Sequence, residues 1–196
     1  AFRIPVKYLY LLSDSGRAMP SAYSITSDPF FINGNITETA ADTFTQLTIS
    51  APLDSLNQEG LLIHAVYFSG DDPARQPNAE SSIFYQLTAT SKDGRVGVND
   101  ANLISAQQKV VLGGAGEFSG PHVIDLITST ATTSTAGQIT QGGSVIFHTF
   151  RTDNLFLGIQ GFGQGAGRTV QVRVVASRIK LTASAYAALV TNELSS

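Results

Sequence analysis

The clearest indication of the fold is an alternating stretch near the end of the chain, Val170-Gln-Val-Arg-Val-Val-Ala-Ser-Arg-Ile-Lys-Leu181. The valines at positions 170, 172 and 174 share one face of an extended chain, because successive side chains of a β-strand point to opposite sides. Ile179 and Leu181 have the opposite parity. Such a slip indicates a β-bulge, which we expect near residues 175–178. The stretch therefore predicts the longest strand of the chain.

Shorter runs of the same kind occur along the rest of the chain, separated by turn residues. Leu61 to Phe68 is apolar on both faces and predicts a central strand. The run from Ile83 to Thr90 alternates and predicts another strand. The remaining expected strands cover residues 43–50, 109–112, 123–128, 145–150 and 155–160.

Turn and helix signals fill the gaps between these runs. Asn33-Gly34 is typical of a two-residue turn. Asp100 has the residue type that caps a helix, and it predicts one short helical turn through Gln107. Residues 129–143 are rich in Ser, Thr, Gly and Ala, and they predict a long surface loop or an arm between subunits.

The two ends of the chain predict an edge strand and a helix. Phe2, Ile4, Val6, Tyr8, Tyr10 and Leu12 alternate with other residues. Pro5 cannot donate a ladder hydrogen bond, so this strand is expected at a sheet edge, where another subunit can pair with it. Residues 1–35 are therefore interpreted as an N-terminal edge strand or arm of a single domain that spans residues 1–196. The Ala-rich residues 182–190 predict a short C-terminal helix.

Eight or nine short strands with turn-rich spacers predict an all-β fold, and the number fits a single jelly-roll-type sandwich or barrel of about eight strands. An immunoglobulin-like sandwich has a similar number of strands. It usually has a core Trp and a Cys pair, however, and this chain contains neither residue type.

The composition argues against several functions. Charged residues make up 14% of the 196 residues, against the usual ~25%, and hydrophobic residues make up 42%. Uncharged polar surfaces suit subunit contacts, because burying hydroxyls and amides costs less than burying charge. The net charge of −3 and the lack of a basic cluster argue against electrostatic binding of nucleic acid. The absence of Cys excludes disulfides and thiolate metal sites.

No set of residues predicts catalysis or a cofactor. The three histidines, His64, His122 and His148, lie in or beside expected strands, and no Gly-x-Ser-x-Gly elbow surrounds any serine. A His-x-His segment of the kind that binds metal in cupin-type jelly rolls is also lacking. We therefore predict no catalytic residue, no cofactor, no metal site and no enzymatic activity.

Carboxylates and glycines are the other candidates. Asp71 and Asp72 are expected to be solvated in a loop. Asp125 interrupts an apolar run, and it would need an arginine (Arg168, Arg173 or Arg178) if it faced inward, whereas the alternation favours an outward position. Glycines at 161, 163, 165 and 167 resemble a phosphate-binding run, but a strand follows them where a helix is needed. They predict a loop between strands that can pack closely against a neighbour.

The chain resembles the single-jelly-roll capsid proteins of icosahedral viruses over about a third of its length. Residues 154–190 combine an apolar strand, a Gly/Ala-rich turn, a long strand that ends in Lys-Leu-Thr, and an apolar tail helix. Residues 37–49 resemble the opening strand of these proteins. The resemblance implies a structural subunit of the virion that self-assembles into a capsid through barrel, loop and arm contacts. Its partners would be copies of itself, with other coat proteins or an internal membrane. Because the basic arm of many capsid proteins is missing, no sequence-specific binding of nucleic acid is expected.

Other functions fit the same features. The segment from Arg3 to Leu12 could be a donated strand in an extracellular or cell-surface filament of the pilus-like kind. A carbohydrate-binding β-sandwich is a further alternative, although such modules usually present Trp or Tyr platforms and this chain has no Trp. An enzyme of the cupin type is the last alternative, and the missing His-x-His segment argues against it.

Overall fold

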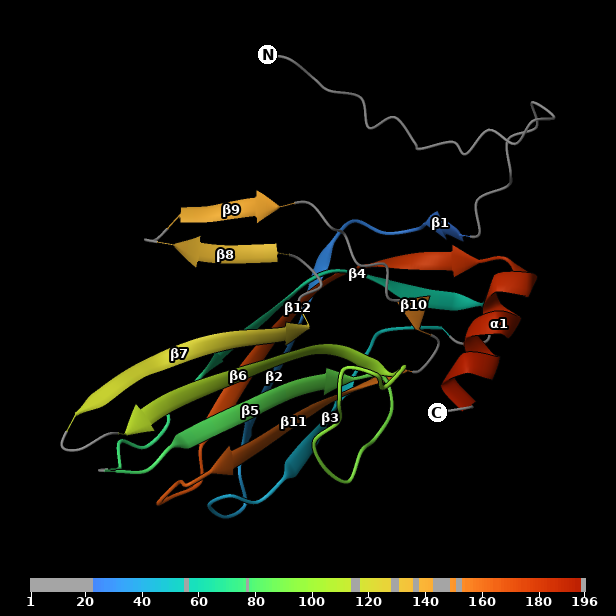
Figure 1. Cartoon of the computed structure of the whole chain (residues 1–196). Coiled ribbons are helices and arrows are strands. Elements are labelled where there is room, and N and C mark those ends of the chain that lie inside the picture. Colours follow the sequence, from blue (N-terminus) through green and yellow to red (C-terminus); the bar gives the residue numbers. More distant parts are fainter. Residues whose placement is uncertain are drawn as a thin grey trace.

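The computed structural model describes residues 23–54, 57–76, 78–113, 117–127, 131–135, 138–142, 149–150 and 153–194. These residues form twelve strands and one helix (Figure 1). The elements are β1 (Tyr23–Ile25), β2 (Phe30–Thr37), β3 (Thr45–Ser50), β4 (Glu59–Gly70), β5 (Ser81–Thr88), β6 (Leu103–Gly113), β7 (Phe118–Ile127), β8 (Ala131–Thr135), β9 (Gln138–Gly142), β10 (Thr149–Phe150), β11 (Asn154–Phe162), β12 (Thr169–Leu181) and α1 (Ala183–Leu194).

Two antiparallel sheets pack face to face, as the jelly-roll prediction requires. One sheet has the order β1-β12-β4-β10, with β2 also paired to β12, and the other has the order β3-β11-β5-β6-β7. The pairs are nested: β2 pairs with β12, β3 with β11, β4 with β10, and β5 with β6. A long antiparallel ribbon that folds around a core produces this order, which is that of a jelly roll. The all-β fold with a C-terminal helix is therefore confirmed.

The main core lies between the two sheets. It is built from one parity of each strand, because alternate side chains of a half-buried strand face the core. Inward residues of β12 and β11 meet those of β4 and β5, and the largest are fully buried: Leu61, Ile63, Ile83, Tyr85, Leu87, Leu155, Leu157 and Ile159. Burying a Leu or Ile side chain stabilises the fold by about 1.5–3 kcal/mol, so this layer is the main source of stability.

The parity slip of the apolar residues in β12 does not come from a bulge in β12 itself. The register between β12 and β4 does shift between Val175 and Ala176, where the bulge was expected. The extra residue, however, is His64 on β4, since Val175 pairs with Ala65 and Ala176 pairs with Ile63. Within β12 the alternation continues unbroken, so Ile179 and Leu181 face the opposite side of the sheet from Val174.

The tail helix explains why that opposite side is buried. Ile179 and Leu181 form a small second core with Leu62, against which Tyr23 and the helix residues Ala185 and Tyr186 pack. The helix begins after Thr182, whose Oγ1 accepts a hydrogen bond from the backbone N–H of Ala185, as an N-cap residue does. A third small core on the other sheet contains Phe84 and Leu103 with Ala106, and Val96 of the β5–β6 connection packs against it.

Several local predictions were wrong. Asn33-Gly34 lies inside β2 and not in a turn, and Asp100 precedes β6 and not a helical turn. The 129–143 stretch holds the hairpin β8–β9, which pairs with neither main sheet among the described residues. The strand expected at residues 145–150 is observed in part. Thr149–Phe150 form β10, and residues 145–148 lie outside the described residues.

The predicted N-terminal arm is described in part. Residues 1–22, including the expected strand with Pro5, lie outside the described residues. Within residues 23–35, β1 and most of β2 pair with β12 and form an edge of that sheet. This part of the predicted arm is therefore integrated into the sandwich.

Candidate functional site

The most distinctive surface is the outward face of β2, β12 and β4, where cross-strand neighbours form three rows. The first row is Asn35, Gln171 and Ser69, the second is Asn33, Arg173 and Tyr67, and the third is Phe31, Val175 and Ala65. We call these nine residues the outer platform. It changes from amides and a hydroxyl at one end to apolar groups at the other, with Arg173 at its centre.

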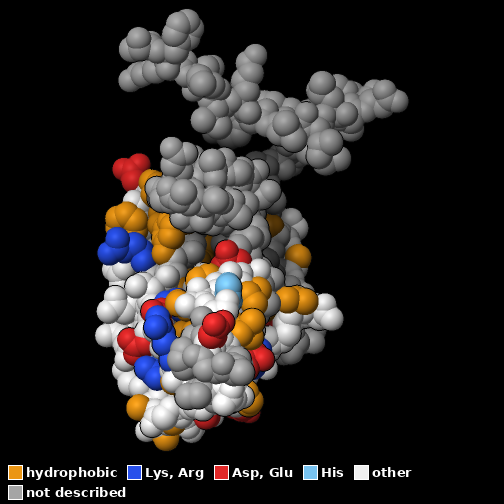
Figure 2. All heavy atoms as spheres, turned by 60° about the vertical axis from the view of Figure 1, so that its left-hand side comes forward, with side chains coloured by type: hydrophobic (Ala, Val, Ile, Leu, Met, Phe, Trp, Pro, Cys, Tyr) orange, Lys and Arg blue, Asp and Glu red, His pale blue; other side chains and the backbone are white. Residues whose placement is uncertain are grey.

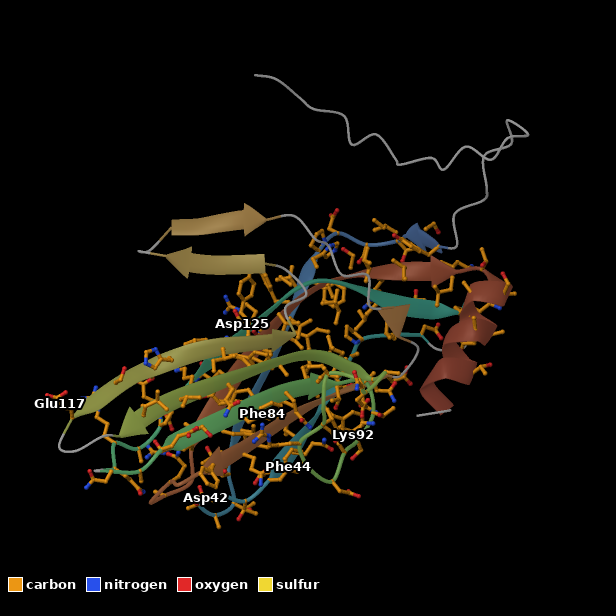
Figure 3. All side chains as sticks on the ribbon, viewed as in Figure 1. Asp42, Phe44, Phe84, Lys92, Glu117 and Asp125 are labelled. Atoms are coloured by element: carbon orange, nitrogen blue, oxygen red, sulfur yellow. The ribbon has the colours of Figure 1, made fainter. Side chains whose placement is uncertain are left out.

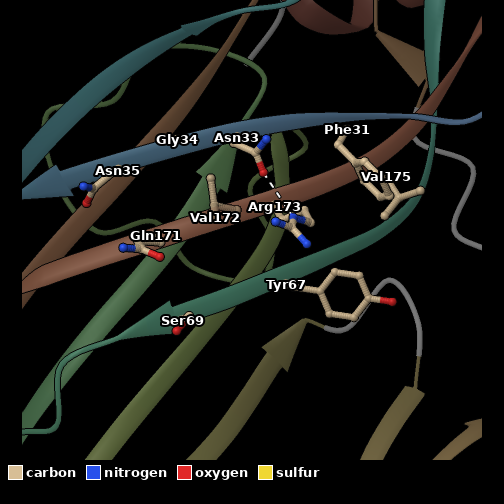
Figure 4. A pocket seen from close by; sticks show the side chains of 10 residues that line it. All are labelled: Phe31, Asn33, Gly34, Asn35, Tyr67, Ser69, Gln171, Val172, Arg173 and Val175. Carbon is tan, nitrogen blue, oxygen red and sulfur yellow. Dashed lines mark hydrogen bonds between the residues drawn. The ribbon is translucent and has the colours of Figure 1, made fainter.

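The platform forms a shallow hollow of about 780 Å³, with Gly34 and Val172 at its floor. Figure 4 shows Asn35, Gln171 and Ser69 on one side of it and Phe31, Val175 and Tyr67 on the other. The aromatic side chains are open to solvent, since Phe31 is 63% exposed and Tyr67 is 50% exposed. Neighbouring strands lie about 4.8 Å apart and alternate residues about 6.6 Å apart, so the platform measures roughly 10 by 13 Å between its outermost Cα atoms.

Arg173 is held in place by two neighbours. Its Nε donates a hydrogen bond of 3.2 Å to Oδ1 of Asn33, and its guanidinium carbon lies 5.4 Å from the ring centre of Phe31. No carboxylate among the described residues forms an ion pair with it. Because its Nε is occupied by Asn33, the two Nη groups remain to donate to a ligand in the fork geometry that suits a carboxylate.

A second surface lies on β7, the edge strand of the other sheet. Val123 is 54% exposed and Ile124 is 45% exposed, although adjacent strand residues face opposite sides. Leu112 on the neighbouring β6 is also exposed. Figure 3 shows Glu117 and Asp125 toward the two ends of this strand. β7 thus exposes one large apolar side chain on each face and, within the described residues, is unpaired along one edge.

Two histidines form hydrogen-bonded pairs with serines. Nε2 of His64 lies 2.8 Å from Oγ of Ser177, and Nε2 of His122 lies 2.8 Å from Oγ of Ser119. Neither ring is hydrogen-bonded to a carboxylate among the described residues, and Ser177 is almost fully buried. A nucleophile needs both an accessible oxygen and an oriented base, so neither pair has the arrangement of a catalytic centre. His148 lies outside the described residues.

His64 predicts a dependence of stability on pH. Burial lowers the pKa of His64 below its ordinary value of 6.5. The unfolded chain therefore binds a proton more readily, and the stabilisation that is present above about pH 6.5 is lost as the pH falls. We expect His64→Gln to weaken the fall in unfolding free energy between about pH 7 and pH 5, measured by urea titration. A fall of the same size in the wild type and in His64→Gln would contradict the assignment.

Asp71, Asp72 and Asp125 are exposed to solvent, as the sequence predicts. Asp125 is exposed and accepts a hydrogen bond from Gln107, and among the described residues it forms no ion pair with an arginine. Asp71 and Asp72 are exposed in the loop after β4. Asp72 forms an ion pair of 3.1 Å with Lys109, and Oδ2 of Asp71 accepts a hydrogen bond from the backbone of Thr169.

The glycine run connects β11 to β12, as predicted, and its neighbours are polar groups of this chain. Glu38 is buried and accepts hydrogen bonds from the backbone N–H groups of Gly161 and Arg168. Asp42 accepts one from the N–H of Gln164. These loop N–H groups are therefore occupied by carboxylates, which argues against a phosphate at this place.

Sequence reasoning missed the platform. It considered Arg173 as a partner of Asp125, and it interpreted Asn33-Gly34 as a turn. The available signal was the polar parity of β2 and β12, at Asn33, Asn35, Gln171 and Arg173. That parity marks an outward face, but only the strand register shows that the two polar sets meet.

No group of three or more potential metal ligands occurs among the described residues. In the same part of the chain, no helix has the length and apolar character needed to cross a membrane. Comparison with known proteins finds no family model that matches the sequence and no similar curated protein.

Proposed function

We propose that this chain is a structural subunit that self-assembles into a viral capsid or coat. The jelly-roll order of the two sheets supports this function by analogy with the capsid proteins that the sequence resembles. A fold alone hosts many functions, so the proposal needs a surface suited to assembly. The observation that carries it is the edge strand β7 with its exposed apolar residues Val123 and Ile124.

Strand β7 has the properties of a contact surface. A sheet edge presents unpaired N–H and C=O groups that template pairing with another chain. Val123 and Ile124 would lose exposed apolar area if a neighbouring copy covered them, and each buried Å² contributes about 25 cal/mol. Charged residues, which would oppose such burial, are few: between Ser119 and Asp125 the strand has the single carboxylate of Asp125.

A shell also needs a second, different surface on each copy, because contacts between unlike surfaces continue from copy to copy. The edge of the other sheet supplies one. There β1 pairs with β12, and Ile25 on β1 is 59% exposed. In the view of Figure 2, Lys, Arg, Asp and Glu side chains are scattered among hydrophobic and uncharged polar ones. The residues of β1 itself, Tyr23–Ile25, carry no charge, so this edge can be buried at little electrostatic cost.

The test is a pair of surface variants with opposite expected results. Wild-type protein should sediment as large particles and show regular shells by electron microscopy. The double variant Val123→Lys with Ile124→Lys should remain folded, since both positions are exposed, but should lose the particles. Val98→Lys, at another exposed valine, should still assemble.

Two results would contradict the proposal in different ways. A wild-type chain that stays monomeric at high concentration would overturn assembly as the function. Particles that survive in the double variant would overturn the role of β7. Circular dichroism on each variant separates a lost contact from a lost fold.

A further inference from the structure

We propose that the outer platform binds an acidic carbohydrate, a sugar that carries a carboxylate such as a sialic or uronic acid. This inference goes beyond assembly and uses a different surface. The platform lies on the face of the β2–β12–β4 sheet, whereas the proposed assembly contacts lie at β7 and β1.

Charge is the first argument. Arg173 carries the one formal charge of the platform, and it has no carboxylate partner among the described residues. Its Nε–H bond to Asn33 and its position over Phe31 orient the guanidinium before any ligand arrives. A pre-oriented arginine loses less side-chain entropy on binding, and its Nη groups match the two oxygens of a carboxylate.

The polar end of the platform is the second argument. Asn35 and Gln171 are exposed cross-strand neighbours, and their side chains make no hydrogen bond to another described residue. Their amides can both donate and accept, as hydroxyl groups require. Ser69 adds a hydroxyl on the third strand of the same row. This row therefore offers partners to several adjacent hydroxyl groups at once.

The two aromatic rings are the third argument. Phe31 lies on β2 in the apolar row, Tyr67 lies on β4 beside Arg173, and both rings are exposed. A sugar ring has an apolar C–H face and a polar rim, so it complements a surface that changes from aromatic to amide over roughly 13 Å along the strands. The hollow of about 780 Å³ lies within the usual range of small-molecule sites, about 300–1,000 Å³.

The test is a titration of the full chain with 3′-sialyllactose and with a hyaluronan tetrasaccharide, followed by calorimetry or NMR. Lactose is the neutral control. We expect at least one acidic sugar to bind more tightly than lactose. Arg173→Gln should weaken that binding about tenfold or more, because it removes the charged donor. Arg173→Lys should weaken it less, since the charge remains while the fork is lost.

Matched variants keep the result specific. Arg95→Gln, at an arginine that lies 4.2 Å from the ring centre of Phe84 on the other sheet, should leave sugar binding unchanged. Tyr67→Ala should reduce binding without unfolding the protein, because the ring is half exposed. Thermal unfolding of each variant checks that the fold is intact.

Three outcomes would overturn the inference. They are no binding of either acid at millimolar concentration, equal binding of lactose, and equal losses in the Arg173 and Arg95 variants. A loss of assembly in Arg173→Gln without any sugar binding would also overturn it, and would assign the platform to a second copy of the chain. Failure of the β7 variants to affect assembly leaves this inference standing, so the two proposals fail independently.

Discussion

Replacing Val174 by aspartate is expected to lower the free energy of unfolding by about 4–5 kcal/mol or more, whereas Val175→Asp should change it by less than about 1 kcal/mol. Val174 is fully buried in the main core, where a carboxylate would have no partner and would lose its hydration. Val175 belongs to the outer platform, two residues from Arg173 on the same face. The two substitutions are chemically identical and adjacent, so their difference reports the orientation of β12.

Urea unfolding followed by far-ultraviolet circular dichroism measures both variants. Since a domain of this kind has about 5–15 kcal/mol in total, Val174→Asp could fail to accumulate as folded protein. Val174→Ala then serves as a milder variant that should still cost about 2 kcal/mol for the buried methyl groups it removes. Similar losses at the two positions for aspartate would contradict the assigned faces.

The strands could be predicted because alternation is a local property of the sequence. In β5 and in the first half of β12 the inward residues have the parity that the sequence indicated, whereas β4 is apolar on both faces and changes parity at His64. Parity shows which side of a strand is buried, however, and not what buries it. Ile179 and Leu181 were therefore taken as evidence of a bulge in their own strand. In the structure they are buried on the opposite face, under α1.

The wrong turn predictions have a similar origin. Asn33-Gly34 is a good turn signal when only the neighbouring residues are considered. In β2, Gly34 pairs with Val172, and a Cβ atom at Gly34 would overlap Cδ1 of Ile49 from the other sheet. This glycine therefore allows a close approach between the sheets. That requirement arises from a residue fifteen positions away, and no local pattern contains it.

The outer platform was beyond sequence reasoning for the same reason. Its three rows join residues from β2, β4 and β12, which lie far apart in the sequence. The residue types of one strand indicate a polar face, but they do not show that Asn33, Arg173 and Tyr67 are neighbours. Register is set by the whole sheet, and one residue of slip would place each of them on the core side.

The glycine-rich connection before β12 holds the second large expected effect, at Gln164. Its side chain is buried and makes all four hydrogen bonds that an amide can make. Oε1 accepts from the N–H of Ala74 and from Nε of Arg168, and Nε2 donates to the carbonyls of Ser82 and Phe162. The amide therefore joins the glycine-rich loop to the β4–β5 connection and to the start of β5.

Gln164→Ala is expected to lower the free energy of unfolding by roughly 2–6 kcal/mol, because each of the four bonds contributes about 0.5–1.5 kcal/mol. Gln171→Ala, at an exposed glutamine of the outer platform, should change it by about 0.5 kcal/mol or less. Gln164→Glu keeps the shape but replaces the two donors by an acceptor that faces two carbonyls, so it should also destabilise the fold. Urea titrations of the three variants test this assignment. If Gln164→Glu were as stable as the wild type, the Nε2 bonds would not be what holds the loop, and its order would have to come from Glu38 and Asp42.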